Sequence, residues 1–270
     1  MKQGLLIILS VCTLQMYGQL NPVLKNKRGI LILPQEGEFA IGFSANPILT
    51  YMGNLVNGNT FNPSPQPAFA AADKMIFGKY MKTNQMAYRA SFRIGVNRNK
   101  QTFEVKDLTP GAAVDATVQD EQIRSSTFIG FAAGFEKRRG ATRLQGFYGG
   151  EAVFQYRTGE NIKYNYGNEI EKIGPNVLRA TQVQSRAGFS AGVRGFAGVE
   201  YFVAPRVSLA AEFGYALTVG SWGESVETRE SYDAVQQKAV ENKTELSPKA
   251  TVINLDSDNY NGIIRLCFYF

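Results

Sequence analysis

Apolar and polar residues alternate with a period of two along most of this chain. The clearest segment covers residues 85–99, where Tyr88 and Phe92 share one face while Arg89 and Arg93 share the other. Successive side chains of a β-strand point to opposite faces, so this pattern predicts a strand with one apolar and one polar face. Eight segments of this kind are present, at residues 38–50, 74–81, 85–99, 126–136, 143–157, 186–204, 206–220 and 259–270.

The connections between these segments alternate between short and long. The short ones lie at residues 82–84, 138–141 and 204–205, and the long ones at 52–73, 100–125, 158–185 and 221–258. Outer-membrane barrels have short periplasmic turns and long extracellular loops, with their apolar side chains facing lipid. We therefore predict an all-β protein with one eight-stranded antiparallel up-and-down transmembrane β-barrel at residues 38–270. The alternative is a soluble eight-stranded barrel of lipocalin type.

Charged residues recur on the polar face of the predicted strands. An eight-stranded barrel has an interior that side chains fill, and buried charges are tolerated when they are paired. We predict an interior ion-pair network made of Arg89, Arg93, Glu151, Arg194, Glu200, Glu212 and Arg265. The alternative is that these charges line a conduction path, which would make the protein a narrow pore.

The amino terminus has the order of a secretory signal peptide. Lys2 precedes an apolar run from Leu5 to Leu14, and small or polar residues follow at Gly18 and Gln19. The run is too short for a transmembrane helix, which needs about 20 apolar residues. We predict a signal peptide at residues 1–18 and a periplasmic arm or short plug at 19–37. The rival interpretation, a lipoprotein, would require lipidation of Cys12.

The positive net charge of +6 raises the question of a nucleic-acid partner. The densest basic group, Lys137 to Arg139, is short and falls in a predicted turn, and no nucleic-acid motif accompanies it. We therefore expect no nucleic-acid binding. Removal of Cys12 with the signal peptide would leave Cys267 as a single thiol, so no disulfide is expected.

The sequence gives little support for an enzymatic function. The chain has no histidine, which removes mechanisms that use histidine as general base. The acidic residues of segment 221–258, such as Glu224 and Glu230, are typical of a solvated surface. We expect no enzymatic activity, no metal and no cofactor. Trp222, the only tryptophan, could be an interfacial anchor or a ligand contact.

Three motifs resemble a known group of proteins. They are Gly-Phe-Tyr-Gly-Gly-Glu at 146–151, Gly-Val-Arg-Gly-Phe-Ala-Gly-Val-Glu-Tyr-Phe at 192–202, and the terminal Cys-Phe-Tyr-Phe. With these the chain resembles the small OmpA-like and OmpX-like outer-membrane barrels (porin-family-like proteins) of Bacteroidota. The resemblance implies that Leu266, Phe268 and Phe270 form the carboxy-terminal signal that the barrel-assembly machinery recognises. Because the last predicted strand ends at Phe270, we expect no peptidoglycan-binding domain.

The resemblance implies an architecture more firmly than a task. We expect a non-enzymatic cell-surface protein of the outer membrane whose long extracellular loops recognise or adhere to something outside the cell. Its expected partners are outer-membrane lipid, the assembly machinery during biogenesis, and an extracellular ligand or outer-membrane protein. The alternative is an accessory subunit of a secretion or uptake complex, docked through small outward residues such as Gly146, Gly150 and Gly195.

Overall fold

The chain folds into one large antiparallel β-sheet. The computed structural model describes residues 24–45, 49, 53, 76–174, 177–257 and 263–270. Its strands are accompanied by the short helix α3 (Ile170–Ile173). No helix in these ranges has the length and apolar character needed to cross a membrane. The predicted all-β antiparallel fold is confirmed.

Eight strands close into a ring. They are β1 (Phe39–Ser44), β2 (Ile76–Thr83), β3 (Met86–Lys106), β4 (Thr117–Arg139), β5 (Leu144–Arg157), β8 (Gly188–Ala204), β9 (Val207–Trp222) and β13 (Ile263–Tyr269). Each pairs antiparallel with the next in this order, and β13 pairs with β1 to complete the circuit. Each of these strands overlaps one of the eight segments that the alternation identified, and β3 and β4 extend beyond the predicted bounds.

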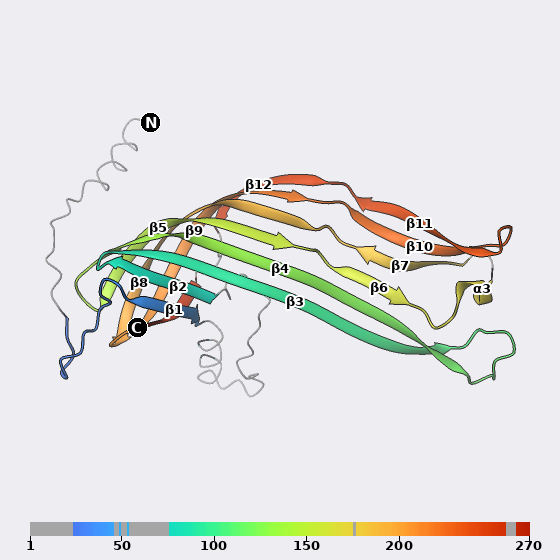
Figure 1. Cartoon of the computed structure of the whole chain (residues 1–270), viewed down its shortest axis with the longest axis horizontal. Coiled ribbons are helices and arrows are strands. Elements are labelled where there is room, and N and C mark those ends of the chain that lie inside the picture. The colour runs from blue at the N-terminus through green and yellow to red at the C-terminus, as the bar shows by residue number, and fades with distance from the viewer. Residues whose placement is uncertain (1–23, 46–48, 50–52, 54–75, 175–176, 258–262) are drawn as a thin grey trace.

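A second part of the sheet extends beyond the ring. It contains β6 (Asn161–Asn165), β7 (Leu178–Gln184), β10 (Ser225–Asp233) and β11 (Lys238–Ser247), which continue outward from the distal half of β4 in the order β4-β6-β7-β10-β11. We call these strands, with the distal halves of β3 and β4, the projecting sheet. Figure 1 shows β3 and β4 running through both parts of the molecule. The remaining strand, β12 (Ala250–Ser257), pairs with the distal half of β9.

The segments at residues 100–125, 158–185 and 221–258, which were predicted as long loops, instead contain β6, β7, β10, β11, β12 and the distal halves of β3 and β4, so their prediction as loops was wrong. The physical reason is visible along β3, whose exposure alternates as far as Val96 and is high at nearly every position from there to Lys106. A strand with solvent on both faces needs no apolar row, so the alternation that marks a half-buried strand is absent. The segment 52–73 lies mostly outside the described residues.

Turns at the other end of the strands are short. They connect β2 to β3, β4 to β5 and β8 to β9. One boundary differs from the prediction, because Arg138 and Arg139 belong to β4 and the turn follows them. Arg138 was expected in a turn; instead it lies in β4, and its side chain is only 1% exposed. It continues the inward row of Glu136, two residues earlier, which explains its burial.

The two faces of the ring have opposite character. Apolar side chains lie outside: Phe92, Phe131 and Phe154 are cross-strand neighbours on β3, β4 and β5, and each is more than 40% exposed. The inner face carries buried polar and charged groups. A water-soluble sheet buries its apolar face, so the ring is inverted with respect to that arrangement.

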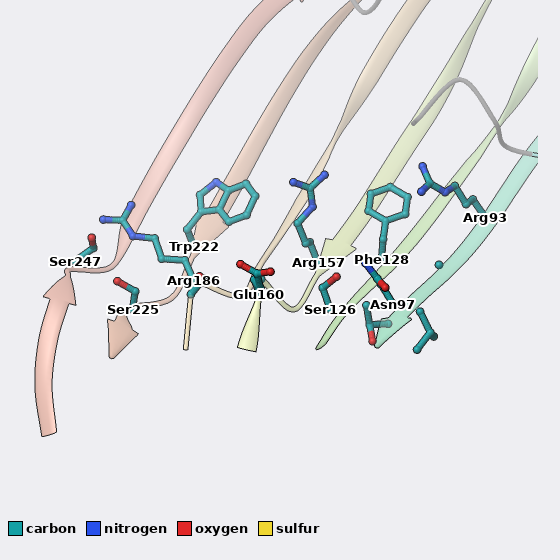
Figure 2. A pocket seen from close by; sticks show the side chains of 15 residues that line it. Arg93, Asn97, Ser126, Phe128, Arg157, Glu160, Arg186, Trp222, Ser225 and Ser247 are labelled. Carbon is teal, nitrogen blue, oxygen red and sulfur yellow. The ribbon is translucent and has the colours of Figure 1, made fainter. Parts of the chain in front are cut away.

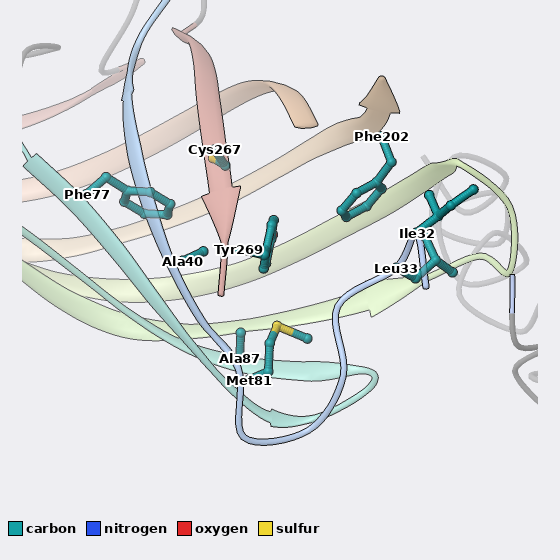
Figure 3. Close-up of a cluster of buried hydrophobic side chains, with 9 residues drawn as sticks. All are labelled: Ile32, Leu33, Ala40, Phe77, Met81, Ala87, Phe202, Cys267 and Tyr269. Atoms are coloured by element: carbon teal, nitrogen blue, oxygen red, sulfur yellow. The ribbon is translucent and has the colours of Figure 1, made fainter. Parts of the chain in front are cut away.

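An apolar cluster fills the short-turn end of the ring. Ile32 and Leu33, which precede β1, pack there with Phe202 and Tyr269 (Figure 3). The rings of Phe202 and Tyr269 lie 5.6 Å apart, and the amide of Arg206 donates to the carbonyl of Ile32 at 3.4 Å. The described part of the amino-terminal segment, residues 24–37, therefore packs against the ring at this end.

Candidate functional site

Two groups of paired charges fill the ring above the apolar cluster. The first, which we call the basal cluster, consists of Lys79, Glu136, Arg138 and Glu200. Lys79 Nζ lies 2.8 Å from Glu136 Oε1 and 3.1 Å from Glu200 Oε2, while Arg138 Nη1 lies 3.1 Å and 2.9 Å from the same two atoms. All four side chains are at most 1% exposed. Each charge therefore has two opposite neighbours, the condition under which buried charge is tolerated.

Neutral groups complete the hydrogen bonding of the basal cluster. The hydroxyls of Ser208 and Tyr269 both donate to Glu200 Oε1, the latter at 2.7 Å. Arg138 donates from Nε and Nη2 to Gln145 Oε1, at 3.0 Å and 2.8 Å. These contacts occupy acceptor sites of Glu200 and donors of Arg138 that take no part in the ion pairs.

The second group, the central cluster, consists of Arg89, Glu151, Arg194, Glu212 and Arg265. Glu212 is its hub, because Arg89 and Arg265 each lie 2.9 Å from Oε2 and Arg194 lies 2.8 Å from Oε1. Glu151 pairs with Arg194 at 2.8 Å and with Arg89 at 3.1 Å. A contact of 3.5 Å from Arg89 to Glu136 joins the two clusters.

The structure brings together most of the interior residues that the sequence singled out. Arg89, Glu151, Arg194, Glu200, Glu212 and Arg265 all take part in these pairs, whereas Arg93 lies further along β3 beside the cleft described below. Lys79, Glu136 and Arg138 were missed. Glu136 and Arg138 alternate on one face of β4, which was an available signal. The alternation at residues 74–81 is irregular and leaves open whether Lys79 points inward.

The carboxy-terminal residues divide between the two faces of the last strand. Phe268 is 41% exposed and Phe270 58%, and Leu266 is half-buried on the same outward row. Cys267 and Tyr269 point inward and are buried. Cys267 is a small interior residue, and the structure describes it as a free thiol.

A cleft opens where the ring meets the projecting sheet. Its volume is about 910 Å³. Figure 2 shows three arginines and two aromatic rings alternating along its wall: Arg186, Trp222, Arg157, Phe128 and Arg93. The remaining lining is largely small or hydroxylated, with side chains such as Ser126, Ser185, Ser225 and Ser247. Trp222 is thus a wall of this cleft, in the position of a potential ligand contact.

The projecting sheet carries a smaller depression of about 480 Å³ near α3. The ring of Tyr166 lies under the guanidinium of Arg179, 4.1 Å from its centroid, and Arg179 Nε lies 2.6 Å from Glu230 Oε1. Partial burial raises the pKa of Tyr166, so its hydroxyl stays protonated at neutral pH and donates to the carbonyl of Ala180 at 2.7 Å. These contacts fix β7 against β10.

Among the residues that the structure describes, no three His, Cys, Asp or Glu side chains lie close enough together to bind a metal ion. No protein-family model matches the sequence, and no curated protein shows significant similarity to it. The functional argument consequently rests on the ring, the paired charges and the cleft.

Proposed function

We propose that the protein is an integral outer-membrane β-barrel that presents its projecting sheet outside the cell as a non-enzymatic recognition surface. The observation that carries the proposal is the inverted ring, with aromatic and aliphatic residues on its outer face and paired charges within. Soluble proteins rarely expose contiguous apolar patches larger than a few hundred Å². A lipid surround would remove such a face from water, and it suits the outward apolar band of outer-membrane barrels.

Strand length also supports membrane insertion. A transmembrane strand needs about 9–11 residues when tilted. Five of the eight ring strands exceed that length, such as β5 with 14 residues, β8 with 17 and β9 with 16. The described lengths of β1, β2 and β13 are 6, 8 and 7 residues. The closed ring satisfies the backbone hydrogen bonds between neighbouring strands, which a lipid environment requires.

The filled interior argues against the alternative of a narrow pore. The basal cluster is fully buried, and Ile32, Phe202 and Tyr269 pack beside it at the short-turn end. Charges that neutralise one another at about 3 Å act as a structural core and leave little free charge to guide ions. The protein's activity is accordingly proposed to lie on its outer parts.

We further propose that the chain belongs with the small OmpA-like and OmpX-like barrels of Bacteroidota. The eight-strand ring and the outward row of Leu266, Phe268 and Phe270 support this assignment. In that arrangement the short turns face the periplasm and the projecting sheet faces the exterior. A cleaved signal peptide at residues 1–18 would provide export; it lies outside the described residues.

Cysteine labelling on intact cells tests the location and orientation. In a Cys267→Ser background, Val235→Cys places a thiol at the 93% exposed tip between β10 and β11, and Thr142→Cys places one in the β4–β5 turn. We expect a membrane-impermeant maleimide to label Val235→Cys on intact cells and Thr142→Cys only after the outer membrane is permeabilised. Labelling of Thr142→Cys on intact cells, or recovery of the protein outside the membrane fraction, would contradict the proposal.

Gentle extraction of tagged protein from native membranes addresses the role of the surface. Recovery of the barrel alone agrees with a solitary recognition protein. A stoichiometric outer-membrane partner, identified by mass spectrometry, would instead make it an accessory subunit.

A further inference from the structure

We infer that the cleft at the junction of the ring and the projecting sheet binds a small organic anion bearing carboxylate or phosphate groups. Arg93, Arg157 and Arg186 would hold the acidic groups, and Phe128 and Trp222 would contact the body of the ligand. The inference concerns a different part of the molecule from the paired charges and does not depend on whether the ring lies in a membrane.

Strand register builds this wall from one continuous cross-strand row. Gly95 on β3 pairs with Phe128 on β4, Phe128 with Arg157 on β5, Arg157 with Gly188 on β8, and Gly188 with Trp222 on β9. Neighbours in such a row share one face of the sheet. Two large side chains, Phe128 and Arg157, therefore lie between the two glycines on the inner face, and Trp222 follows beyond Gly188.

The two glycines leave space that the larger side chains occupy. A Cβ atom at Gly188 would lie 2.5 Å from Cε3 of Trp222, so the indole lies directly over the backbone of β8. At Gly95 a Cβ would lie 3.6 Å from Nη2 of Arg93, whose side chain follows the wall. The missing side chain at Gly188 leaves room for the indole of Trp222, and the missing side chain at Gly95 leaves room for the guanidinium of Arg93.

Charge in the cleft differs from charge in the clusters below it. In the central cluster the carboxylates of Glu151 and Glu212 lie among the arginines. The charged residues that line the cleft are Arg93, Arg157, Arg186 and Glu160. Glu160 also lies 3.7 Å from Arg124, outside the lining, with both side chains more than 40% exposed. Among the described residues that line the cleft, three arginines stand against one glutamate, and an excess of one sign attracts ligands of the opposite sign.

Aromatic contacts hold the guanidinium groups in place before a ligand arrives. The centroid of the Phe128 ring lies 4.6 Å from Cζ of Arg93 and 5.7 Å from Cζ of Arg157. Such cation–π contacts orient a guanidinium over a ring. The planar fork of a guanidinium can form bidentate hydrogen bonds to a carboxylate or phosphate. The volume of about 910 Å³ falls in the usual range for small-molecule pockets.

Trp222 provides a direct assay because it is the only tryptophan of the chain. The full-length protein in detergent is titrated separately with citrate, as a carboxylate probe, and with pyrophosphate, as a phosphate probe, at ionic strength held constant with sodium chloride. We expect a saturable change in Trp222 emission with at least one probe. Response to citrate alone identifies a carboxylate ligand, response to pyrophosphate alone a phosphate ligand, and response to both their shared anionic chemistry.

Matched arginine variants locate the binding. Arg157→Gln removes a guanidinium from the cleft and is expected to raise the dissociation constant at least tenfold. Arg98→Gln removes the same charge from an exposed position of β3 outside the cleft lining and is expected to leave the constant within twofold. Calorimetry on the parent protein, which needs no fluorophore, checks that the emission change reports binding.

Three results would overturn the inference. The first is that neither probe gives a saturable response at concentrations up to 10 mM. The second is that Arg157→Gln leaves the dissociation constant unchanged. The third is that Arg98→Gln raises the dissociation constant as much as Arg157→Gln does. The last would show that the anions respond to overall charge. Circular dichroism of each variant, matching that of the parent protein, confirms that a loss of binding does not come from unfolding.

Discussion

The ring and the projecting sheet share two strands but use their side chains in opposite ways. Within the ring, β3 alternates between exposed apolar residues and inward polar ones; beyond Val96 nearly all of its side chains are exposed. Ion pairs change in the same way. Lys79 and Glu136 pair with no more than 1% exposure, whereas Lys100 and Glu121 pair on the projecting sheet with 53% and 28% exposure. One continuous strand thus passes from a structure held by buried charge to one held mainly by its backbone ladder.

The largest effect that separates the two regions is expected from Glu200→Ala. The substitution leaves Lys79 and Arg138 buried with one carboxylate, Glu136, between them, and it removes the acceptor of Ser208 and Tyr269. Breaking a buried pair costs about 3–5 kcal/mol. Chemical denaturation of the protein in detergent, followed by circular dichroism, should show a loss of that size. A loss under about 1 kcal/mol would mean that the basal cluster is not a structural core.

A smaller effect is expected from adding a methyl group to the inner wall. In Gly149→Ala the new Cβ would lie 2.0 Å from the carbonyl oxygen of Phe135 and 2.7 Å from the ring of Phe196. Overpacking of this kind costs about 1–3 kcal/mol. The matched control is Gly146→Ala on the same strand, where a Cβ meets nothing within 4 Å. Equal unfolding free energies for the two variants would contradict the account of a filled interior and an open outer face.

On the projecting sheet the corresponding removal of a carboxylate should matter less. Glu230→Ala breaks the ion pair with Arg179. The side chain of Arg179 is 14% exposed and that of Glu230 is 18% exposed. Because water can solvate the remaining guanidinium, we expect a loss of about 1 kcal/mol or less. The same denaturation assay measures it. A loss as large as that of Glu200→Ala would erase the distinction between the regions.

The smallest effect concerns the pH dependence of the β3–β4 hairpin. The hydrogen bond from Lys100, with Nζ 2.6 Å from Glu121 Oε1, holds the pKa of Glu121 below its ordinary value. Because the pKa of Glu121 is lowered in the folded protein, the pair stabilises the hairpin at pH values above the ordinary pKa of a glutamate. This stabilisation is lost as the pH falls through the pKa of Glu121 in the folded protein. Carbon-13 NMR titration of Glu121 should give the low pKa, and Lys100→Ala should raise it. An identical pKa in both proteins would contradict the pairing.

The sequence predicts the ring well because each ring strand separates two environments. Alternation at residues 85–99 and 206–220 identified β3 and β9 and assigned Arg89 and Glu212 to the inner face. It could not identify β11, since solvent on both sides leaves its side chains without a required order. It also missed β10, whose residues are mostly polar and half-buried and therefore show no apolar row. Turn boundaries were also imprecise, so the buried Arg138 was assigned to a turn instead of to β4.

The cleft was beyond the reach of pattern reasoning for a different reason. Arg93, Phe128 and Trp222 were each visible in the sequence, but their proximity depends on the register between β3, β4, β5, β8 and β9. A shift of one residue in any pair would turn a member of the row to the other face. Register follows from the whole ring, so the arginine–aromatic row appears only once the strands are paired.

Collision accessibility of nitroxide spin labels tests the membrane claim most directly. Labels at Phe131→Cys and Phe213→Cys, on the outer face of the ring, and at Val235→Cys, on the projecting sheet, are compared in lipid vesicles with Cys267→Ser as background. We predict that oxygen, which concentrates in lipid, relaxes the two ring labels strongly, while a water-soluble nickel chelate relaxes only the label at position 235. Equal access of the nickel chelate to all three labels would contradict the membrane-embedded ring.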